Sequence, residues 1–114
     1  MTTCRTSSVF FCRTTQQGFL RLVTNRKVFG KHALSLHEAW EKYDLFQDDT
    51  FVSYMDEPID VEPEWRDYTD AQTYSTKLWN DAYLAAFAHA ADLEMVTFDK
   101  GFIQFQHTRC KILS

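Results

Sequence analysis

Two aspartates stand apart from most other acidic residues and are the strongest candidates for chemistry. Asp81 lies in an alanine-rich segment with helical spacing, and Asp99 directly follows a short apolar segment. Asp81 lies near the apolar side of its helix, where an unpaired carboxylate would be costly. A hard divalent cation such as Mg²⁺ or Mn²⁺ would compensate these carboxylates, and it can activate water and neutralise charge on a phosphoryl group. The simpler alternative to a metal site is that Asp81 lies on a helix surface and Asp99 in an ordinary turn.

The elements that must position these residues alternate between strands and helices. Short runs of β-branched and aromatic residues predict strands over 8–13, 50–55, 94–98 and 110–113. Apolar residues at helical spacing predict helices over 15–24, 35–46, 62–70 and 77–91. This order predicts an α/β protein with a mainly parallel sheet, in which sites form beyond the carboxyl ends of the strands. Asp99 would lie at such an end.

Four residues are predicted to define the ends of two helices. Thr14 or Thr15 is expected to cap the first helix, and Asn25 is expected to stop it in a left-handed conformation. Ser35 and Glu38 form a capping-box pattern for the second helix. In the helix over 77–91, the many alanines predict close packing against the sheet, and the following strand is expected to bury Phe98.

Charge is strongly segregated along the chain, although the net charge is only −4. Residues 1–31 contain six basic residues and no acid, whereas residues 38–70 contain twelve of the sixteen acids. Such a chain can present a basic face to phosphates, although two solvated faces are the simpler interpretation. The candidates to attract a nucleic-acid backbone are Arg13, Arg21, Arg26 and Lys27.

Length and composition predict one small domain over residues 1–114, and no apolar stretch is long enough to cross a bilayer. The first residues lack the pattern of a secretory signal, so we expect a cytoplasmic protein without membrane contact.

Three cysteines without a C-x-x-C pair are expected to be ordinary thiols. The histidines, among them His89 and His107, have no metal-ligand spacing and are expected to be structural or exposed. The three tryptophans are expected in the core.

Three segments resemble the later motifs of PIN-domain proteins of the VapC toxin type. They are Cys12 to Asn25, the Asp-Ala-x-Leu-Ala helix within Leu78 to Ala88, and the Val-Thr-Phe-Asp-x-x-Phe strand end within Met95 to Phe102. The resemblance implies a PIN-like three-layer α/β fold and a divalent-metal-dependent endoribonuclease that hydrolyses RNA phosphodiesters. In that family the two later motifs supply metal-binding carboxylates, which the match assigns to Asp81 and Asp99. The family also implies a cognate antitoxin protein and a homodimer.

Two departures from the family pattern concern its other carboxylates. PIN domains open with a strand that ends in a metal-binding aspartate, and nothing in Met1 to Ser7 resembles it. Gly18 stands where many members have a glutamate. We therefore expect a PIN-like domain that is incomplete at the N-terminus, cleaves RNA poorly and self-associates to cover a sheet defect. The alternatives are a non-catalytic PIN scaffold that binds an antitoxin or itself, and a truncated product without stable activity.

Overall fold

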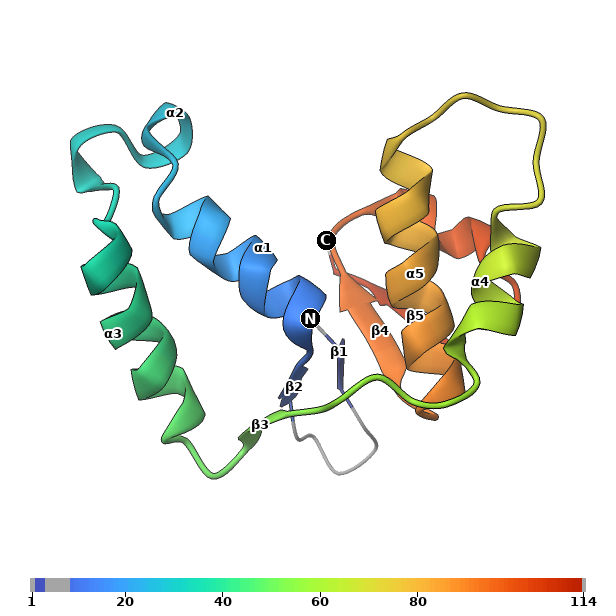
Figure 1. The fold of residues 1–114 in the computed structure, drawn as a ribbon, viewed down its shortest axis with the longest axis horizontal. Coiled ribbons are helices and arrows are strands. Elements are labelled where there is room, and N and C mark those ends of the chain that lie inside the picture. The colour runs from blue at the N-terminus through green and yellow to red at the C-terminus, as the bar shows by residue number, and fades with distance from the viewer. Residues whose placement is uncertain (1, 4–8, 114) are drawn as a thin grey trace. The chain divides into compact units, whose positions relative to one another are not determined.

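The computed structural model describes residues 2–3 and 9–113, which fall into two compact units. One unit comprises Met1–Val9 with Glu57–Ser114, and the other comprises Phe10–Asp56. Figure 1 shows the elements of both. Cys4 and most of Met1 to Ser7, whose sequence does not resemble the opening strand of a PIN domain, lie outside the described residues.

The first unit combines a small sheet with two helices. Strand β4 pairs in parallel with β5, Met95 opposite Cys110, and antiparallel with β1, Thr2 opposite Met95. Helix α5 packs on β4 and lies beside α4 (Figure 1). The elements are β1 (Thr2–Thr3), α4 (Val61–Tyr68), α5 (Lys77–Ala90), β4 (Glu94–Thr97), the 3₁₀ helix η2 (Lys100–Gln104) and β5 (Cys110–Ile112). The predicted alternation of helices and strands, with a parallel pair, is confirmed.

Alanines allow α5 to approach its neighbours closely, as the composition predicts. Ala82, Ala85, Ala86 and Ala88 are fully buried. The Thr108 hydroxyl donates a hydrogen bond of 2.7 Å to the carbonyl of Ala85, which ties the segment before β5 to the helix. The rest of this core consists of larger apolar side chains, namely Val61, Phe87, Leu93, Met95, Phe102 and Phe105.

Phe98 does not belong to this core, contrary to the expectation from the sequence. Its surface is 75% exposed, because β4 ends at Thr97 and the chain then turns into η2. The tryptophans also depart from the core prediction, since Trp40 and Trp79 are about half exposed.

The second unit is held by a cluster of aromatic rings. Phe11 contacts Tyr43 with ring centroids 5.3 Å apart, and Phe19 packs edge-on against Phe46 at 5.5 Å. Strands β2 and β3 are neighbours, and the Met55 amide donates to the Phe11 carbonyl. The elements around the cluster are β2 (Val9–Phe11), α1 (Arg13–Val23), α2 (Arg26–Phe29), the 3₁₀ helix η1 (Gly30–His32), α3 (Leu36–Gln47) and β3 (Val52–Tyr54).

The helix caps agree with the sequence prediction for α3 but not for α1. Ser35 caps α3 and forms the expected capping box with Glu38. Helix α1 begins earlier than predicted, with Cys12 as its cap, and Thr15 instead accepts a hydrogen bond from the Cys12 amide. Asn25 is not left-handed, since its φ is −86°, and its side chain caps α2 by accepting from the Lys27 amide. Short polar side chains suit both roles, so composition alone does not separate them.

Within residues 2–3 and 9–113, no helix is both long and apolar enough to cross a membrane. Cys12 and Cys110 are free thiols.

Candidate metal centre

The structure brings Asp81 and Asp99 together, as the sequence predicts. The Lys77 ammonium donates a hydrogen bond of 2.6 Å to Asp81 Oδ2 and one of 2.8 Å to Asp99 Oδ2. Both carboxylates are therefore within reach of a single cation. Asp81 comes from the first half of α5, and Asp99 follows the carboxyl end of β4. A strand end and a helix start thus form one acidic site within the first unit.

Asp99 is held by the backbone that follows it. Its Oδ1 atom accepts a hydrogen bond of 2.8 Å from the Gly101 amide, and its own amide donates to Thr97 Oγ1 at 3.1 Å. A Cβ atom at Gly101 would lie only 3.0 Å from Asp99 Oδ1, so the missing side chain makes room for the carboxylate. Hydrogen bonds from Lys77 and then from Gly101 lower the pKa of Asp99. These contacts keep the carboxylate charged and oriented.

Asp81 is more enclosed than Asp99. Its side chain is 19% exposed, against 41% for Asp99, and it adjoins the fully buried Ala82. The charge compensation that its environment requires comes from Lys77, one helical turn earlier. Hydrogen bonds to Asp81 and then to Asp99 raise the pKa of Lys77, so the ammonium stays protonated at neutral pH.

The donor set of this site suits a hard divalent cation. Two carboxylates offer oxygen ligands, and Mg²⁺ is commonly bound through one or two carboxylates together with water and substrate phosphates. The pair already binds one cationic group, the Lys77 ammonium, which shows that its geometry accommodates a positive charge. Asp81 and Asp99 would hold the ion.

The four basic residues proposed to attract nucleic acid all lie in the second unit and are exposed. Arg13 is the most constrained, because its guanidinium lies over the Tyr54 ring, 5.2 Å from the centroid, and donates to Gln16 at 2.6 Å. Arg21 lies in α1, and Arg26 and Lys27 begin α2. The structure thus leaves their charged groups accessible to solvent.

Comparison with known proteins identifies the family. The sequence pattern of the PIN domain matches residues 6–107. The chain belongs to the PIN-domain family. It is also 42% identical over 110 residues to "Ribonuclease VapC41" from Mycobacterium tuberculosis, in both strain CDC 1551 and strain H37Rv. The match covers 93% of the chain and 75% of each relative. The resemblance to VapC-type PIN proteins and the α/β PIN-like fold are therefore confirmed.

Two contributors to the site of this PIN domain were not predicted from the sequence. Lys77 bridges the two aspartates, and Gly101 makes room for the Asp99 carboxylate. The spacing of Lys77 and Asp81, four residues apart on a helix, is a signal that could have revealed the first. No signal in the sequence pointed to the role of Gly101.

His89 and His107 are exposed, in agreement with the prediction from the sequence, and both approach the carboxylate of Glu64. Sequence spacing could not reveal this cluster, because its members come from α4, α5 and the segment before β5.

Proposed function

We propose that this chain is a divalent-metal-dependent endoribonuclease of the VapC type, with Asp81 and Asp99 as its metal-binding carboxylates. The observation that carries the proposal is the shared hydrogen bonding of both carboxylates to one ammonium group, in a chain of the PIN-domain family. The 42% identity to a protein named as a ribonuclease supports the reaction. The family match and this identity do not favour the non-catalytic alternative.

Each residue of the site has a distinct part in this proposal. Asp81 and Asp99 hold Mg²⁺ or Mn²⁺, and the amide of Gly101 keeps Asp99 oriented. A metal ion bound there would lower the pKa of a water molecule and neutralise charge on the phosphoryl group of RNA. Lys77 balances the two negative charges when no metal ion is bound. A further carboxylate from elsewhere completes the site, because two carboxylates alone hold a hydrated ion weakly.

RNA is the proposed substrate, and basic residues of the second unit are the proposed attraction for its backbone. Arg13, Arg21, Arg26 and Lys27 carry positive charge in a chain with a net charge of −4. Contacts of this kind act on phosphates without reading sequence, and they weaken as salt concentration rises. Cleavage should therefore lose efficiency with added salt.

A cognate antitoxin and a second copy of the chain are the proposed protein partners, and the cytoplasm is the proposed location. Large apolar side chains on α2 and α3 support a protein partner, since exposed apolar patches mark interaction sites. The most exposed of these side chains are Val28, Leu36, Trp40 and Leu45.

The decisive experiment measures cleavage of RNA by the purified chain with and without Mg²⁺ or Mn²⁺. We expect slow metal-dependent cleavage that Asp81→Asn and Asp99→Asn each abolish, while Asp48→Asn, at an exposed acid of the second unit, leaves it unchanged. Metal binding without cleavage would favour the non-catalytic scaffold. Cleavage that survives Asp99→Asn would refute the site assignment.

A further inference from the structure

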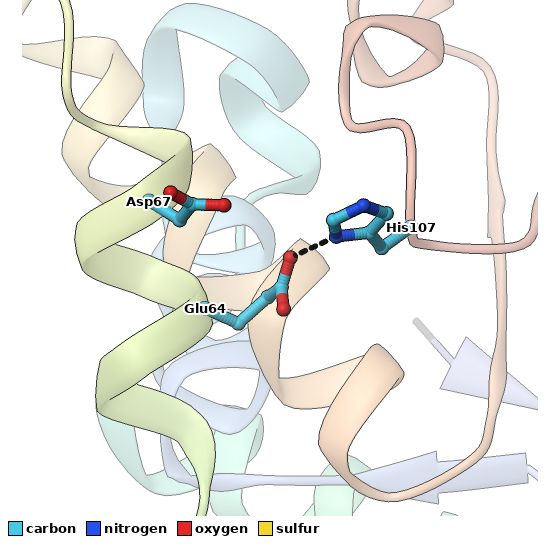
Figure 2. A group of neighbouring side chains, drawn as sticks. All are labelled: Glu64, Asp67 and His107. Carbon is cyan, nitrogen blue, oxygen red and sulfur yellow. Dashed lines mark hydrogen bonds and ion pairs between the residues drawn. The ribbon is translucent and has the colours of Figure 1, made fainter.

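A second group of ligand-type side chains lies in the same unit as the two aspartates but at a different place. Figure 2 shows Glu64 and Asp67 projecting from α4 toward His107, which precedes β5. One ligand atom from each of these three residues lies within 4.8 Å of the other two. Glu64 Oε1 is 2.6 Å from His107 Nδ1. None of these residues takes part in the proposed ribonuclease site.

A fourth residue, His89 near the end of α5, faces the same carboxylate. Its Nε2 atom is 3.7 Å from Glu64 Oε2, and its Nδ1 atom is 2.8 Å from the carbonyl oxygen of His107. A carbonyl only accepts, so Nδ1 carries the proton. In the neutral ring, the lone pair of Nε2 then faces a carboxylate. A metal ion between the two groups would make this contact favourable.

The hydrogen bond that orients His89 is of the kind that orients histidines bound to metal ions. Such histidines usually donate the other ring N–H to a carbonyl or carboxylate, which fixes the tautomer and the orientation of the ring. His89 has this partner in the carbonyl of His107. Glu64 is the enclosed centre of the group, with a side chain 16% exposed. Asp67 completes it with a carboxylate that has no hydrogen bond or ion pair to another described residue.

We propose that Glu64, Asp67 and His107, with His89 as a fourth ligand, form a site for a divalent transition metal such as Zn²⁺. Carboxylate and imidazole together favour such ions, whereas Mg²⁺ prefers oxygen ligands alone. In a tetrahedral zinc site with bonds of about 2.0–2.1 Å, ligand atoms lie roughly 3.4 Å apart. Glu64 Oε1 and His107 Nδ1 are 2.6 Å apart, and the ligand atoms of Glu64, Asp67 and His107 all lie within 4.8 Å of one another. Side-chain rotations would bring these three to zinc distances, and His89 would join them from its place 3.7 Å from Glu64.

An ion can reach this site from solvent. A surface hollow of about 490 Å³ is lined by Asp60, Pro63, Glu64, His89 and Ala90. A metal ion there joins α4, the end of α5 and the segment before β5, so it acts as a structural clamp. His89 lies eight residues beyond Asp81 on α5, a rise of about 12 Å. The clamp is thus separate from the acidic pair and does not depend on the proposed ribonuclease activity.

The test is calorimetric titration of the full chain with ZnCl₂ in excess Mg²⁺, which saturates sites built from oxygen ligands alone. Asp67→Asn is the central variant, because its side chain supports no other described contact and the fold should persist. His107→Ala is the second. We expect each to weaken Zn²⁺ binding more than about tenfold. We also expect Zn²⁺ to raise the thermal unfolding midpoint of the unmodified chain but not that of Asp67→Asn.

Two matched variants should keep full Zn²⁺ affinity. His37→Ala removes a histidine that lies 3.4 Å from Glu41 on the exposed face of α3, a pair that no third ligand joins within the described part of the chain. Asp99→Asn disables the acidic pair. If this variant still binds Zn²⁺, the Zn²⁺ site is distinct from the proposed ribonuclease site. The proposal is overturned if Asp67→Asn and His107→Ala bind Zn²⁺ like the unmodified chain. It is also overturned if His37→Ala causes an equal loss, since binding would then be nonspecific.

Discussion

Lys77 donates a hydrogen bond of 2.8 Å to Asp99, although the two residues are 22 positions apart in the chain. The same ammonium is 2.6 Å from Asp81, the other member of the acidic pair. It therefore lies where both carboxylates can be neutralised at once, the place that a bound cation would take. A metal ion bound at the proposed site would compete with the lysine for the same oxygen atoms.

Replacement of Lys77 by Met should tighten the binding of Mg²⁺ or Mn²⁺. The ion no longer has to displace an ammonium group from the two carboxylates. Because the lysine side chain is 68% exposed, solvent screens the interaction, and we expect the dissociation constant to fall only about two- to fivefold. Calorimetric titration with Mg²⁺ or Mn²⁺ measures this dissociation constant.

Lys100→Met is the control, since the Lys100 side chain adjoins the site in sequence but bonds to neither aspartate. Weaker binding in Lys77→Met would show that Lys77 orients the acids rather than competing for them.

Replacement of Gly101 by Ala should reduce metal-dependent RNA cleavage by about tenfold, because small displacements of catalytic groups are costly. The new Cβ would lie 3.0 Å from Asp99 Oδ1, so the carboxylate must shift by a few tenths of an ångström. The backbone at Gly101 does not require glycine, since its φ is not positive. Circular dichroism should therefore show an intact fold. Ile103→Ala, at an exposed position of the same 3₁₀ helix, should cleave normally. Equal activity in both variants would show that the position of Asp99 is not critical.

Local patterns were sufficient to predict most of the fold. Apolar spacing located α3 and α5, and the Ser35 and Glu38 pattern located the start of α3. Asp99 could be placed at a strand end because the apolar run of β4 stops just before it. Phe98 could not be placed, since an aromatic residue next to a strand reads as part of it, and only the turn into η2 exposes the side chain.

Apart from the approach of Asp81 to Asp99, long-range side-chain contacts were not predictable from one sequence. The approach of Asp81 to Asp99 was expected from the topology of parallel sheets, which brings strand ends to one edge. The lysine between them depends on a side-chain conformation. The meeting of Glu64 with His89 and His107 depends on how α4 packs against α5, and no spacing rule encodes that packing.

The capping box of α3 should appear in the titration of Glu38. Hydrogen bonds from the backbone and then the side chain of Ser35 lower the pKa of Glu38. A lowered folded-state pKa means that the stabilisation is present above the ordinary glutamate pKa and is lost as pH falls through the folded value. Carbon NMR of the carboxyl group should show the lowered pKa. In Ser35→Ala it should move toward the ordinary value, and the free energy of unfolding should fall by about 1 kcal/mol. An unchanged Glu38 titration in Ser35→Ala would contradict the capping box.

The purified chain should self-associate through apolar side chains of the second unit. Val28 and Leu36 are more than half exposed, and Trp40 is nearly so. Apolar surface of this kind promotes association, because burying it removes contact with water. Sedimentation velocity over a dilution series should show dimers or larger species that dissociate on dilution.

Trp40→Ser is the variant that tests this association. Loss of the indole should shift the equilibrium toward the monomer by about tenfold or more, since buried aromatic side chains dominate many interfaces. Trp79→Ser is the matched control, because Trp79 is at least as exposed as Trp40 but belongs to the first unit. A compact monomer at every concentration, with cooperative unfolding and no binding of dyes that report exposed apolar surface, would contradict the prediction. If Trp79→Ser shifts the equilibrium toward the monomer as strongly as Trp40→Ser does, association also involves the first unit.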